Sequence, residues 1–228
     1  MSEVLKNVDA YLADPTAVSD GEFKKSRATK QTILEAMTQL LAEQGFAACS
    51  TPAIARAAGL SRTAMLYHFP TRRVLLEAVV VHITRRRVEM HEEMLAELPR
   101  DDGFRNGAVE AGWAQVQTPE FKAFCELSMA ARTDAELDQV FKASQEAFDR
   151  ARRDAALQLA EPEVAASPVF DLRRDIHRLV LEGLAKQDGI AFDVERRSDE
   201  LFAFLKLLWS DEGEVFLTEA LTGTKDRD

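Results

Sequence analysis

The sequence has only two cysteines and no long apolar run, and each shortage excludes a class of protein. In a chain of 228 residues, Cys49 and Cys125 give no disulfide framework, and neither has a partner at a metal-site spacing. No stretch reaches the roughly 18 apolar residues of a membrane-spanning helix. The N-terminal residues mix acids with apolar residues and lack the basic start of a signal peptide. We therefore expect a cytoplasmic protein with no membrane partner.

Motifs of catalysis are missing as well. The sequence contains no Gly-rich phosphate loop, no Gly-x-Ser-x-Gly elbow, no His-Glu-x-x-His pair and no Cys-x-x-Cys pair. His82 and His91 lie about 2.5 helical turns apart, on opposite faces of a helix, so one metal ion cannot readily bind both. We expect no catalytic residues, no cofactor and no metal site, and an enzyme is the disfavoured alternative.

Acidic residues outnumber basic ones, but they are unevenly distributed. The formal net charge of −10 by itself argues against a nucleic-acid ligand. Residues 24–90, however, hold 11 of the 29 Lys and Arg residues and 4 of the 39 Asp and Glu residues, so this segment carries +7 and the remainder −17. A basic module attached to an acidic body fits a protein that contacts DNA at one end. Accidental surface variation is the alternative.

Two short helices inside this basic module predict a helix-turn-helix. Thr51 is expected to cap the first helix, and Pro52 follows at a position where a missing N–H costs nothing. Gly59 supplies the backbone freedom that ends this helix, and Ser61 caps a second helix over residues 62–68. In such a motif the second helix enters the major groove of DNA while the first crosses the backbone.

These residues carry a family resemblance. From about residue 30 to 76 the chain resembles the DNA-binding domain of the TetR (tetracycline repressor) family of regulators. The residues that match the family pattern are Ile33, Ala36, Leu40, Gly45, Phe46, Thr51, Ile54, Ala55, Ala58, Gly59, Ser61, His68, Phe69, Arg72, Leu75 and Leu76. Thr63 stands where the family usually has Gly, and Leu66 where it usually has Tyr, with Tyr67 one position later.

The resemblance implies an all-α chain, in which an N-terminal three-helix helix-turn-helix domain precedes a C-terminal helical domain for effector binding and dimerisation. It implies a homodimer on a near-palindromic double-stranded DNA operator, most often a repressor that a small molecule releases. An activator of the same architecture is one alternative. A helical interaction protein that has lost specific DNA binding is another.

Three segments are expected: an N-terminal extension at 1–23, the DNA-binding domain at 24–71 and the ligand-binding and dimerisation domain at 72–228. Thr71, Thr118 and Asp134 are expected to cap helices. The expected helices outside the helix-turn-helix cover about 27–44, 72–98, 104–117, 119–131, 134–160, 168–187, 194–210 and 213–221.

Contacts with DNA are expected from the start of the second helix and from basic residues around it. Arg62 can donate two hydrogen bonds to a guanine edge. Thr63 and Tyr67 are expected on a thymine methyl group or the backbone, although core packing is the alternative for Tyr67. The basic lead-in, formed by Lys24, Lys25 and Arg27, can lie along phosphates or reach a minor groove, and a solvated charge run is the alternative. His68 and Arg72 are expected on phosphates. The further DNA-binding residues are therefore Lys24, Lys25, Arg27, Thr51, Ser61, His68 and Arg72.

Dimerisation is expected through the helices at 168–187 and 194–210, because their apolar stripes are wider than one core face requires. Gly183 would permit a partner helix to approach closely. The expected interface residues are Leu172, Ile176, Leu179, Val180, Gly183, Leu201, Leu205, Leu208 and Trp209. The alternative is that both helices are wholly internal.

An effector cavity is expected among the four helices between residues 104 and 187, because large apolar side chains recur there beside a few polar ones. This mixture suits an apolar or aromatic small molecule. The expected lining residues are Trp113, Phe121, Phe124, Cys125, Ser128, Met129, Phe141, Ser144, Phe148 and His177. Ordinary core packing is the alternative at each of these positions.

Overall fold

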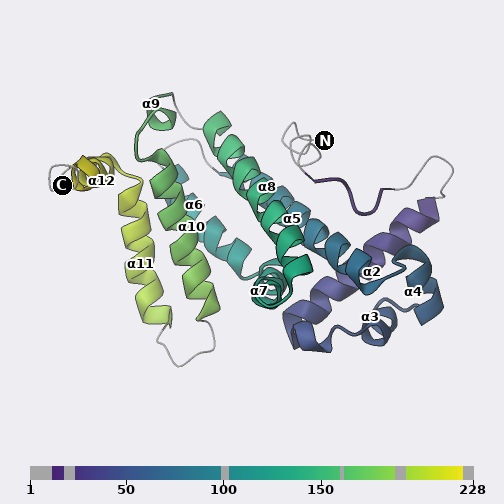
Figure 1. Cartoon of the computed structure of the whole chain (residues 1–228). Helices are drawn as coiled ribbons and strands as arrows, with labels where there is room; N and C mark the ends of the chain where they lie inside the picture. Colours follow the sequence, from purple (N-terminus) through teal and green to yellow (C-terminus); the bar gives the residue numbers. More distant parts are fainter. Residues whose placement is uncertain (1–11, 18–23, 99–102, 160–161, 188–193, 223–228) are drawn as a thin grey trace. The chain divides into compact units, whose positions relative to one another are not determined.

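The computed structural model describes residues 12–17, 24–98, 103–159, 162–187 and 194–222. Over these ranges the chain is mainly helical and no residue lies in a strand (Figure 1), so the expected all-α class is confirmed. The elements in chain order are α2 (Lys24–Gln44), the 3-10 helix η1 (Phe46–Ala48), α3 (Thr51–Ala57), α4 (Arg62–His68), α5 (Arg72–Glu97), α6 (Gly103–Val116), α7 (Pro119–Ala131), α8 (Ala135–Leu159), α9 (Pro162–Ala165), α10 (Phe170–Lys186), α11 (Val194–Leu208) and α12 (Asp211–Thr222).

Four helices begin at side-chain caps that the sequence predicts. Ser61, Thr71, Thr118 and Asp134 each accept a hydrogen bond from a backbone N–H in the first turn of the following helix, over 3.0–3.3 Å. Such bonds satisfy N–H groups that have no partner inside the helix. The starts of α4, α5, α7 and α8 are therefore set by local chemistry.

Two predicted helix starts are wrong. Ser50, not Thr51, caps α3, because the Ser50 hydroxyl accepts the hydrogen bond from the Ala53 N–H at 3.3 Å. The helix expected to open at residues 167–168 begins at Phe170, after a turn in which the Phe170 N–H donates to the Ser167 carbonyl at 3.1 Å. The short helix α9 before that turn was not expected.

Within the expected N-terminal extension, residues 12–17 form a strap over α2 and α5. Asp14 accepts a hydrogen bond from Arg27 of α2 at 2.8 Å, and the Leu12 carbonyl accepts one from Arg85 of α5 at 2.9 Å. Leu12 is buried and packs in a small apolar cluster with Val88 of α5 and residues of α8. The strap is therefore held by polar bonds to two helices and by apolar packing.

The helices form two compact units, each described by itself. The first unit comprises Met1–Glu92 and Thr118–Arg152, and the second comprises Glu93–Gln117 and Arg153–Asp228. This division does not follow the expected boundary between residues 71 and 72. The reason is that α7 packs along α2, so α7 and the first part of α8 share a core with the N-terminal helices.

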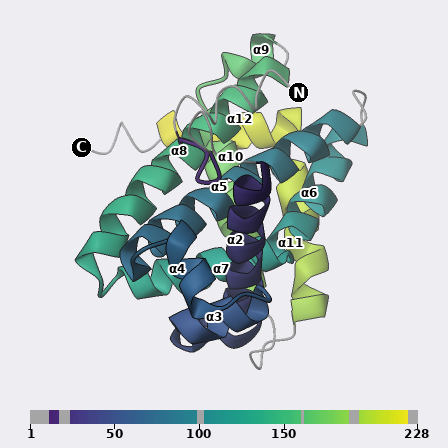
Figure 2. The same cartoon turned by 90° about the vertical axis from the view of Figure 1, so that its right-hand side faces the viewer.

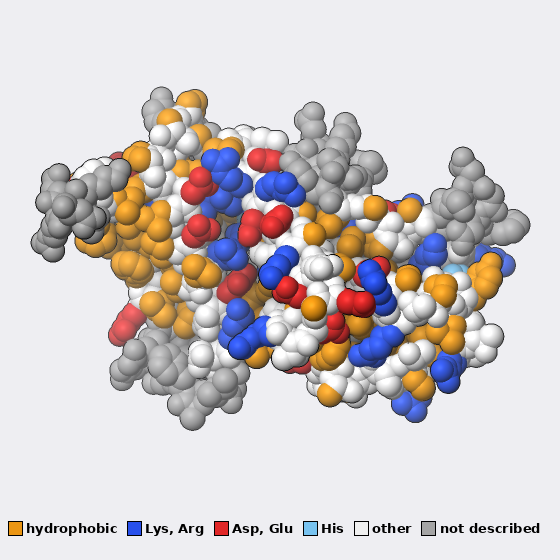
Figure 3. Space-filling view, viewed as in Figure 1, with side chains coloured by type: hydrophobic (Ala, Val, Ile, Leu, Met, Phe, Trp, Pro, Cys, Tyr) orange, Lys and Arg blue, Asp and Glu red, His pale blue; other side chains and the backbone are white. Residues whose placement is uncertain are grey.

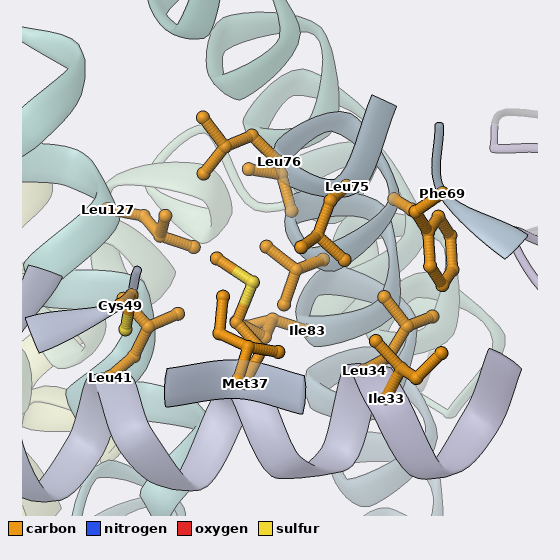
Figure 4. Close-up of a cluster of buried hydrophobic side chains, with 14 of the residues drawn as sticks. Ile33, Leu34, Met37, Leu41, Cys49, Phe69, Leu75, Leu76, Ile83 and Leu127 are labelled. Carbon is orange, nitrogen blue, oxygen red and sulfur yellow. The ribbon is translucent and has the colours of Figure 1, made fainter. Parts of the chain in front are cut away.

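The core of the first unit is built on one face of α2. Ile33, Leu34, Met37 and Leu41 recur at intervals of three and four residues and are fully buried. Figure 4 shows them meeting side chains of α5 and Leu127 of α7. Seen from the side, α3 and α4 lie against α2 (Figure 2). The helix-turn-helix is thus fixed to the same core as α7.

The second unit has its own core, formed mainly by α6, α10, α11 and α12. Its buried apolar residues are Val109, Val169, Leu181, Leu205, Leu208 and Leu217. Trp113 of α6 lies edge-on to Phe202 of α11, with ring centroids 5.5 Å apart. Buried Arg173 of α10 donates hydrogen bonds to Glu214 and to the Ser210 carbonyl, which ties α10 to the start of α12.

A buried histidine makes the stability of the first unit depend on pH. Burial lowers the pKa of His82 below its ordinary 6.5, although Glu35 and Glu89 act to raise it. The fold therefore keeps His82 neutral where the unfolded chain takes up a proton, so stability present above about pH 6.5 is lost as the pH falls below it. Between about pH 7 and 5, the melting temperature of His82→Gln should fall less than that of wild type in thermal unfolding followed by circular dichroism.

The matched control for this measurement is Ile83→Val, because Ile83 is buried beside His82 on the same helix and carries no titratable group. This variant should keep the wild-type dependence on pH. An equal slope in wild type and His82→Gln would contradict the prediction.

Candidate nucleic-acid interface

The turn between α3 and α4 has the geometry of a helix-turn-helix. Gly59 has φ +68°, in the left-handed region that favours glycine. The Leu60 N–H then donates to the Ala55 carbonyl at 2.8 Å, which ends α3. Ser61 has extended backbone angles and caps α4, because its hydroxyl accepts a hydrogen bond from the N–H of Ala64, three residues later. The two helices are therefore joined by the three-residue turn Gly59-Leu60-Ser61, as the sequence predicts.

The two faces of α4 differ sharply. Met65 is 1% exposed and lies in the core of the first unit together with Phe69. On the other face, Arg62 and Thr63 are exposed and Tyr67 is 77% exposed. Leu66 packs partly buried against the core. The structure therefore places Tyr67, and not the residue before it, on the surface that a DNA groove could meet.

Three of the basic residues near this surface have partners within the protein. Arg27 forms an ion pair with Asp14 at 2.8 Å. The Arg72 guanidinium donates to the Cys49 carbonyl at 2.7 Å and lies 5.3 Å from the centre of the Phe46 ring. Arg73 pairs with Glu77 at 2.7 Å and with Glu136 at 3.5 Å. Arg72 thus fastens the start of α5 to the segment before α3.

Three other cations are exposed, and within the described ranges no ion pair or hydrogen bond involves their side chains. They are Lys25 on α2, Arg56 in the last turn of α3 and Arg62 in the first turn of α4. Figure 3 shows Lys and Arg side chains over the region of α3 and α4. Sequence reasoning missed Arg56, although a cation on the first helix of such a motif is suited to the phosphate backbone that this helix crosses.

The remaining DNA-binding candidates have mixed environments. Thr51 is half-buried as the first residue of α3, and Ser61 uses its hydroxyl as the cap of α4. His68 lies with its Nδ1 atom 3.4 Å from the Ser26 hydroxyl of α2 and its ring edge-on to Tyr67. The side chain of Lys24 lies outside the described residues.

Eight of the ten effector-site candidates belong to the first unit, and Trp113 and His177 belong to the second. Phe121, Ser144 and Phe148 are buried. Met129 is 61% exposed, so its side chain lies mostly on the surface, and its place in an effector site stays a prediction. The Ser128 hydroxyl donates to the Cys125 carbonyl at 2.7 Å, and both residues are half-buried.

A buried arginine that sequence reasoning missed lies among these aromatic residues. The Arg87 guanidinium of α5 is 3.9 Å from the centre of the Phe124 ring and 4.1 Å from that of Phe148. The Phe124 ring also stacks on Phe141, with centroids 5.1 Å apart. A cation over ring faces is attracted by their electron density. We call Arg87 and these three rings, from α5, α7 and α8, the aromatic cluster of the first unit.

The residues expected at the dimer interface include both buried and exposed side chains of α10 and α11. Leu205 and Leu208 are 0% and 2% exposed inside the core of the second unit, so their expected place on a partner-facing surface is wrong. Leu179 is 58% exposed, and a Cβ atom added at Gly183 would meet nothing within 4 Å. Leu172, Ile176, Val180, Leu201 and Trp209 are half-buried. The Trp209 indole N–H donates to His177 Nδ1 at 3.2 Å.

Comparison with known proteins adds a family and a set of relatives. Residues 33–79 match the family model described as bacterial regulatory proteins, tetR family. An uncharacterized HTH-type transcriptional regulator of Mycobacterium bovis is 26% identical over 162 residues, which are 71% of this chain and 83% of that protein. A protein of Mycobacterium tuberculosis with the same description matches equally well. The segment that matches the family model, residues 33–79, contains the second half of α2, all of α3 and α4, and the first part of α5.

Two solved structures illustrate the shared fold. Salmonella enterica GusR aligns with a TM-score of 0.59 at 18% identity, over 80% of this chain and 93% of that chain. NalD, the secondary repressor of the MexAB-OprM multidrug efflux pump in Pseudomonas aeruginosa, aligns with a TM-score of 0.52 at 20% identity, over 80% and 96%. At these identities the likeness concerns the fold alone.

Among the described helices, none has the length and apolar character to cross a membrane.

Proposed function

We propose that the chain, a transcriptional regulator of the TetR family with a DNA-binding helix-turn-helix, is a cytoplasmic homodimeric repressor released from its operator by a small molecule. The observation that carries the DNA-binding part is the exposed face of α4. There Arg62, Thr63 and Tyr67 stand clear of the core while Met65 holds the helix in place. The role of NalD as a secondary repressor supports the proposal that this chain also represses transcription.

Selection of bound fragments from genomic DNA would test this proposal. The protein should enrich a near-palindromic sequence with half-sites one helical turn apart, roughly 34–36 Å. Binding to the selected operator should weaken steeply with added salt, because Lys and Arg contacts to phosphates release counterions. Enrichment of no sequence, at low or moderate salt, would favour the helical interaction protein instead. Reporter expression in cells without the regulator would distinguish a repressor from an activator.

Arg62→Ala should relax sequence preference. A guanidinium at the start of a recognition helix can read a guanine edge, a contact worth about 1–3 kcal/mol of discrimination. We expect the ratio between affinities for the operator and for shuffled DNA to fall about 5- to 150-fold, measured by fluorescence anisotropy. The matched control is Arg56→Ala on α3, which should weaken both DNAs alike, because a phosphate contact carries no sequence information. Unchanged discrimination in Arg62→Ala would reject the assignment.

Dimerisation through α10 and α11 is supported by exposed apolar side chains of the second unit. Leu179, Phe204 and Leu207 are 58%, 42% and 48% exposed. Figure 3 shows hydrophobic side chains gathered over α11 and α12. Since exposed apolar patches mark interaction sites, a second copy of the chain is the occupant that a palindromic operator requires. A two-fold axis there would present two copies of α4 to successive turns of DNA.

Leu179→Glu combined with Phe204→Glu should convert the dimer to a monomer. Both side chains are exposed, so the fold should survive, whereas two buried charges at an interface are strongly unfavourable. Light scattering at micromolar concentration measures the change, and operator affinity should fall with it. Met129→Glu on α7 of the first unit, which is 61% exposed, is the matched control and should remain dimeric. A dimeric double variant would place the interface elsewhere.

The effector is proposed to be a small apolar or aromatic molecule that binds at the aromatic cluster. Buried Phe148, the stacked rings of Phe124 and Phe141, and Arg87 supply apolar surface with one charged group. Phe124 lies on α7, and Glu126 of that helix accepts a hydrogen bond from the Phe46 N–H at 3.0 Å. A ligand that displaced α7 would therefore disturb the segment that leads into α3, and such coupling is typically worth 1–3 kcal/mol.

Titration of apolar compounds, with compound binding followed by isothermal titration calorimetry and operator release by fluorescence anisotropy of labelled DNA, tests the effector proposal. A true effector should lower operator affinity about 5- to 150-fold. Glu126→Gln should reduce this response while leaving compound binding intact, because it weakens the contact to the Phe46 N–H without touching the rings. A compound that binds without releasing the operator is not the effector.

A further inference from the structure

A polar cavity of about 620 Å³ lies in the first unit, apart from both the aromatic cluster and the exposed face of α4. Its walls are one face of α2, one face of α5, the strap at residues 14–16 and the start of α7. The lining positions on α2 and α5 recur at helical spacing, so two polar helix faces border one space. A volume of this size falls within the range of small-molecule sites.

The positive charges in this cavity already have partners within the protein. Arg27 pairs with Asp14, and Arg86 pairs with Glu89 at 2.5 Å. Arg85 donates to the Leu12 carbonyl at 2.9 Å. An anionic ligand would have to displace these bonds before it gained any of its own.

Two carboxylates in the same walls have no such neutralisation. Glu35 of α2 accepts a hydrogen bond from the Gln31 amide at 2.7 Å, and within the described ranges neither Glu35 nor Glu120 forms an ion pair. Asp14 and Glu89 are paired with Arg27 and Arg86, so Glu35 and Glu120 carry two negative charges against the one positive charge of Arg85, and the lining has a net charge of −1. A cationic group is the chemistry that this surplus attracts.

A buried side chain adds an independent polar group to the wall. His82 of α5 is 6% exposed and lines the cavity, and no described residue hydrogen-bonds to its ring. Buried polar groups are normally satisfied, so a ring nitrogen that faces the cavity is suited to a ligand's hydrogen bond. Burial lowers its pKa, which keeps the imidazole neutral, so its unprotonated ring nitrogen can accept a hydrogen bond from the N–H of an ammonium group.

We propose that this cavity binds a small organic cation, an aliphatic diamine in chemical class, with one ammonium group on Glu35 and Glu120 and the ligand's N–H within reach of His82. Thr38, 3% exposed on α2, adds a hydroxyl oxygen to the same wall. Because α2 carries the helix-turn-helix and α5 follows it, the ligand would bridge two helices of the DNA-binding part of the chain. The proposal is distinct from the effector at the aromatic cluster.

Isothermal titration calorimetry of the full chain with 1,4-diaminobutane tests the site without any DNA. The diamine should bind, whereas 1,4-butanediol, of similar length but uncharged, and succinate, of opposite charge, should not. Glu120→Gln should weaken binding of the diamine at least about tenfold, since a charge-assisted hydrogen bond is worth about 1.5–3 kcal/mol, or roughly 10- to 150-fold. Glu35→Gln should weaken it about 2- to 5-fold, because Glu35 is exposed and solvent screens its charge.

Glu43→Gln is the matched control, because Glu43 is exposed on α2 and does not line the cavity. It should bind the diamine as wild type does, and melting curves should confirm that all variants are folded. The proposal is overturned if the diamine gives no heat at millimolar concentration, if succinate binds more tightly than the diamine, or if the two cavity variants bind as wild type does.

Discussion

Met65→Ala should lower the free energy of unfolding of the first unit by about 2–5 kcal/mol and weaken binding to every DNA sequence alike. Met65 is the buried residue of α4, 1% exposed within a core that also holds Ile54 of α3. Truncation removes most of its apolar contacts and leaves a cavity that the surrounding helices fill only partly. Because α4 has only seven residues, it has little stability of its own and depends on this packing.

Urea unfolding followed by two signals measures this effect in the right part of the chain. The only two tryptophans, Trp113 and Trp209, lie in the second unit, so their fluorescence reports that unit while circular dichroism reports all helices. Met65→Ala should shift the circular dichroism transition to lower urea more than the fluorescence transition. The matched control is Thr63→Ala, an exposed change on the same helix, which should alter stability by less than about 0.5 kcal/mol. Wild-type unfolding of Met65→Ala would contradict the expectation.

Features that depend on local chemistry could be predicted from the sequence. Ser61, Thr118 and Asp134 cap their helices as expected, because each bond joins a side chain to a backbone N–H only a few residues later. Gly59 ends α3 because it alone relieves the cost of a positive φ. The helix-turn-helix combines such local signals, and so its position was predicted almost to the residue.

Features that depend on partners far along the chain could not be predicted. The sequence marks Arg27 and Arg72 as DNA-binding, but the fold brings them to Asp14 and to the Cys49 carbonyl. The same holds for Leu205, whose helix shows apolar residues around more than half of its circumference without indicating which of them face inward. Arg87 gives no sequence signal at all, since only packing places it between two rings.

One physical cause explains why local features could be predicted and long-range partners could not. A cap or a turn is decided by bonds between residues a few positions apart, whereas the role of a charged side chain depends on which surfaces the helices bring together. The cations left exposed, Lys25, Arg56 and Arg62, could be recognised only after the internal ion pairs were known. Basic composition therefore indicates the segment that carries the proposed DNA-binding surface, but it does not indicate which cations of that segment stay exposed.

Gly213→Ala should destabilise the second unit by about 1–3 kcal/mol or more, because the new methyl group has no space. A Cβ atom at Gly213 would lie 2.3 Å from the Leu207 carbonyl oxygen and 2.8 Å from the Leu208 Cα atom, both backbone atoms at the end of α11. To relieve this overlap, α12 must move away from α11, which loosens buried Leu217 in the same core. Alanine's higher helix propensity, worth about 1 kcal/mol, opposes the loss only in part. Thermal unfolding followed by tryptophan fluorescence should show a lower midpoint, whereas Glu212→Ala, an exposed neighbour in the same turn, should stay near wild type. If Gly213→Ala melts at or above the wild-type temperature, the close approach of α12 to α11 is wrong.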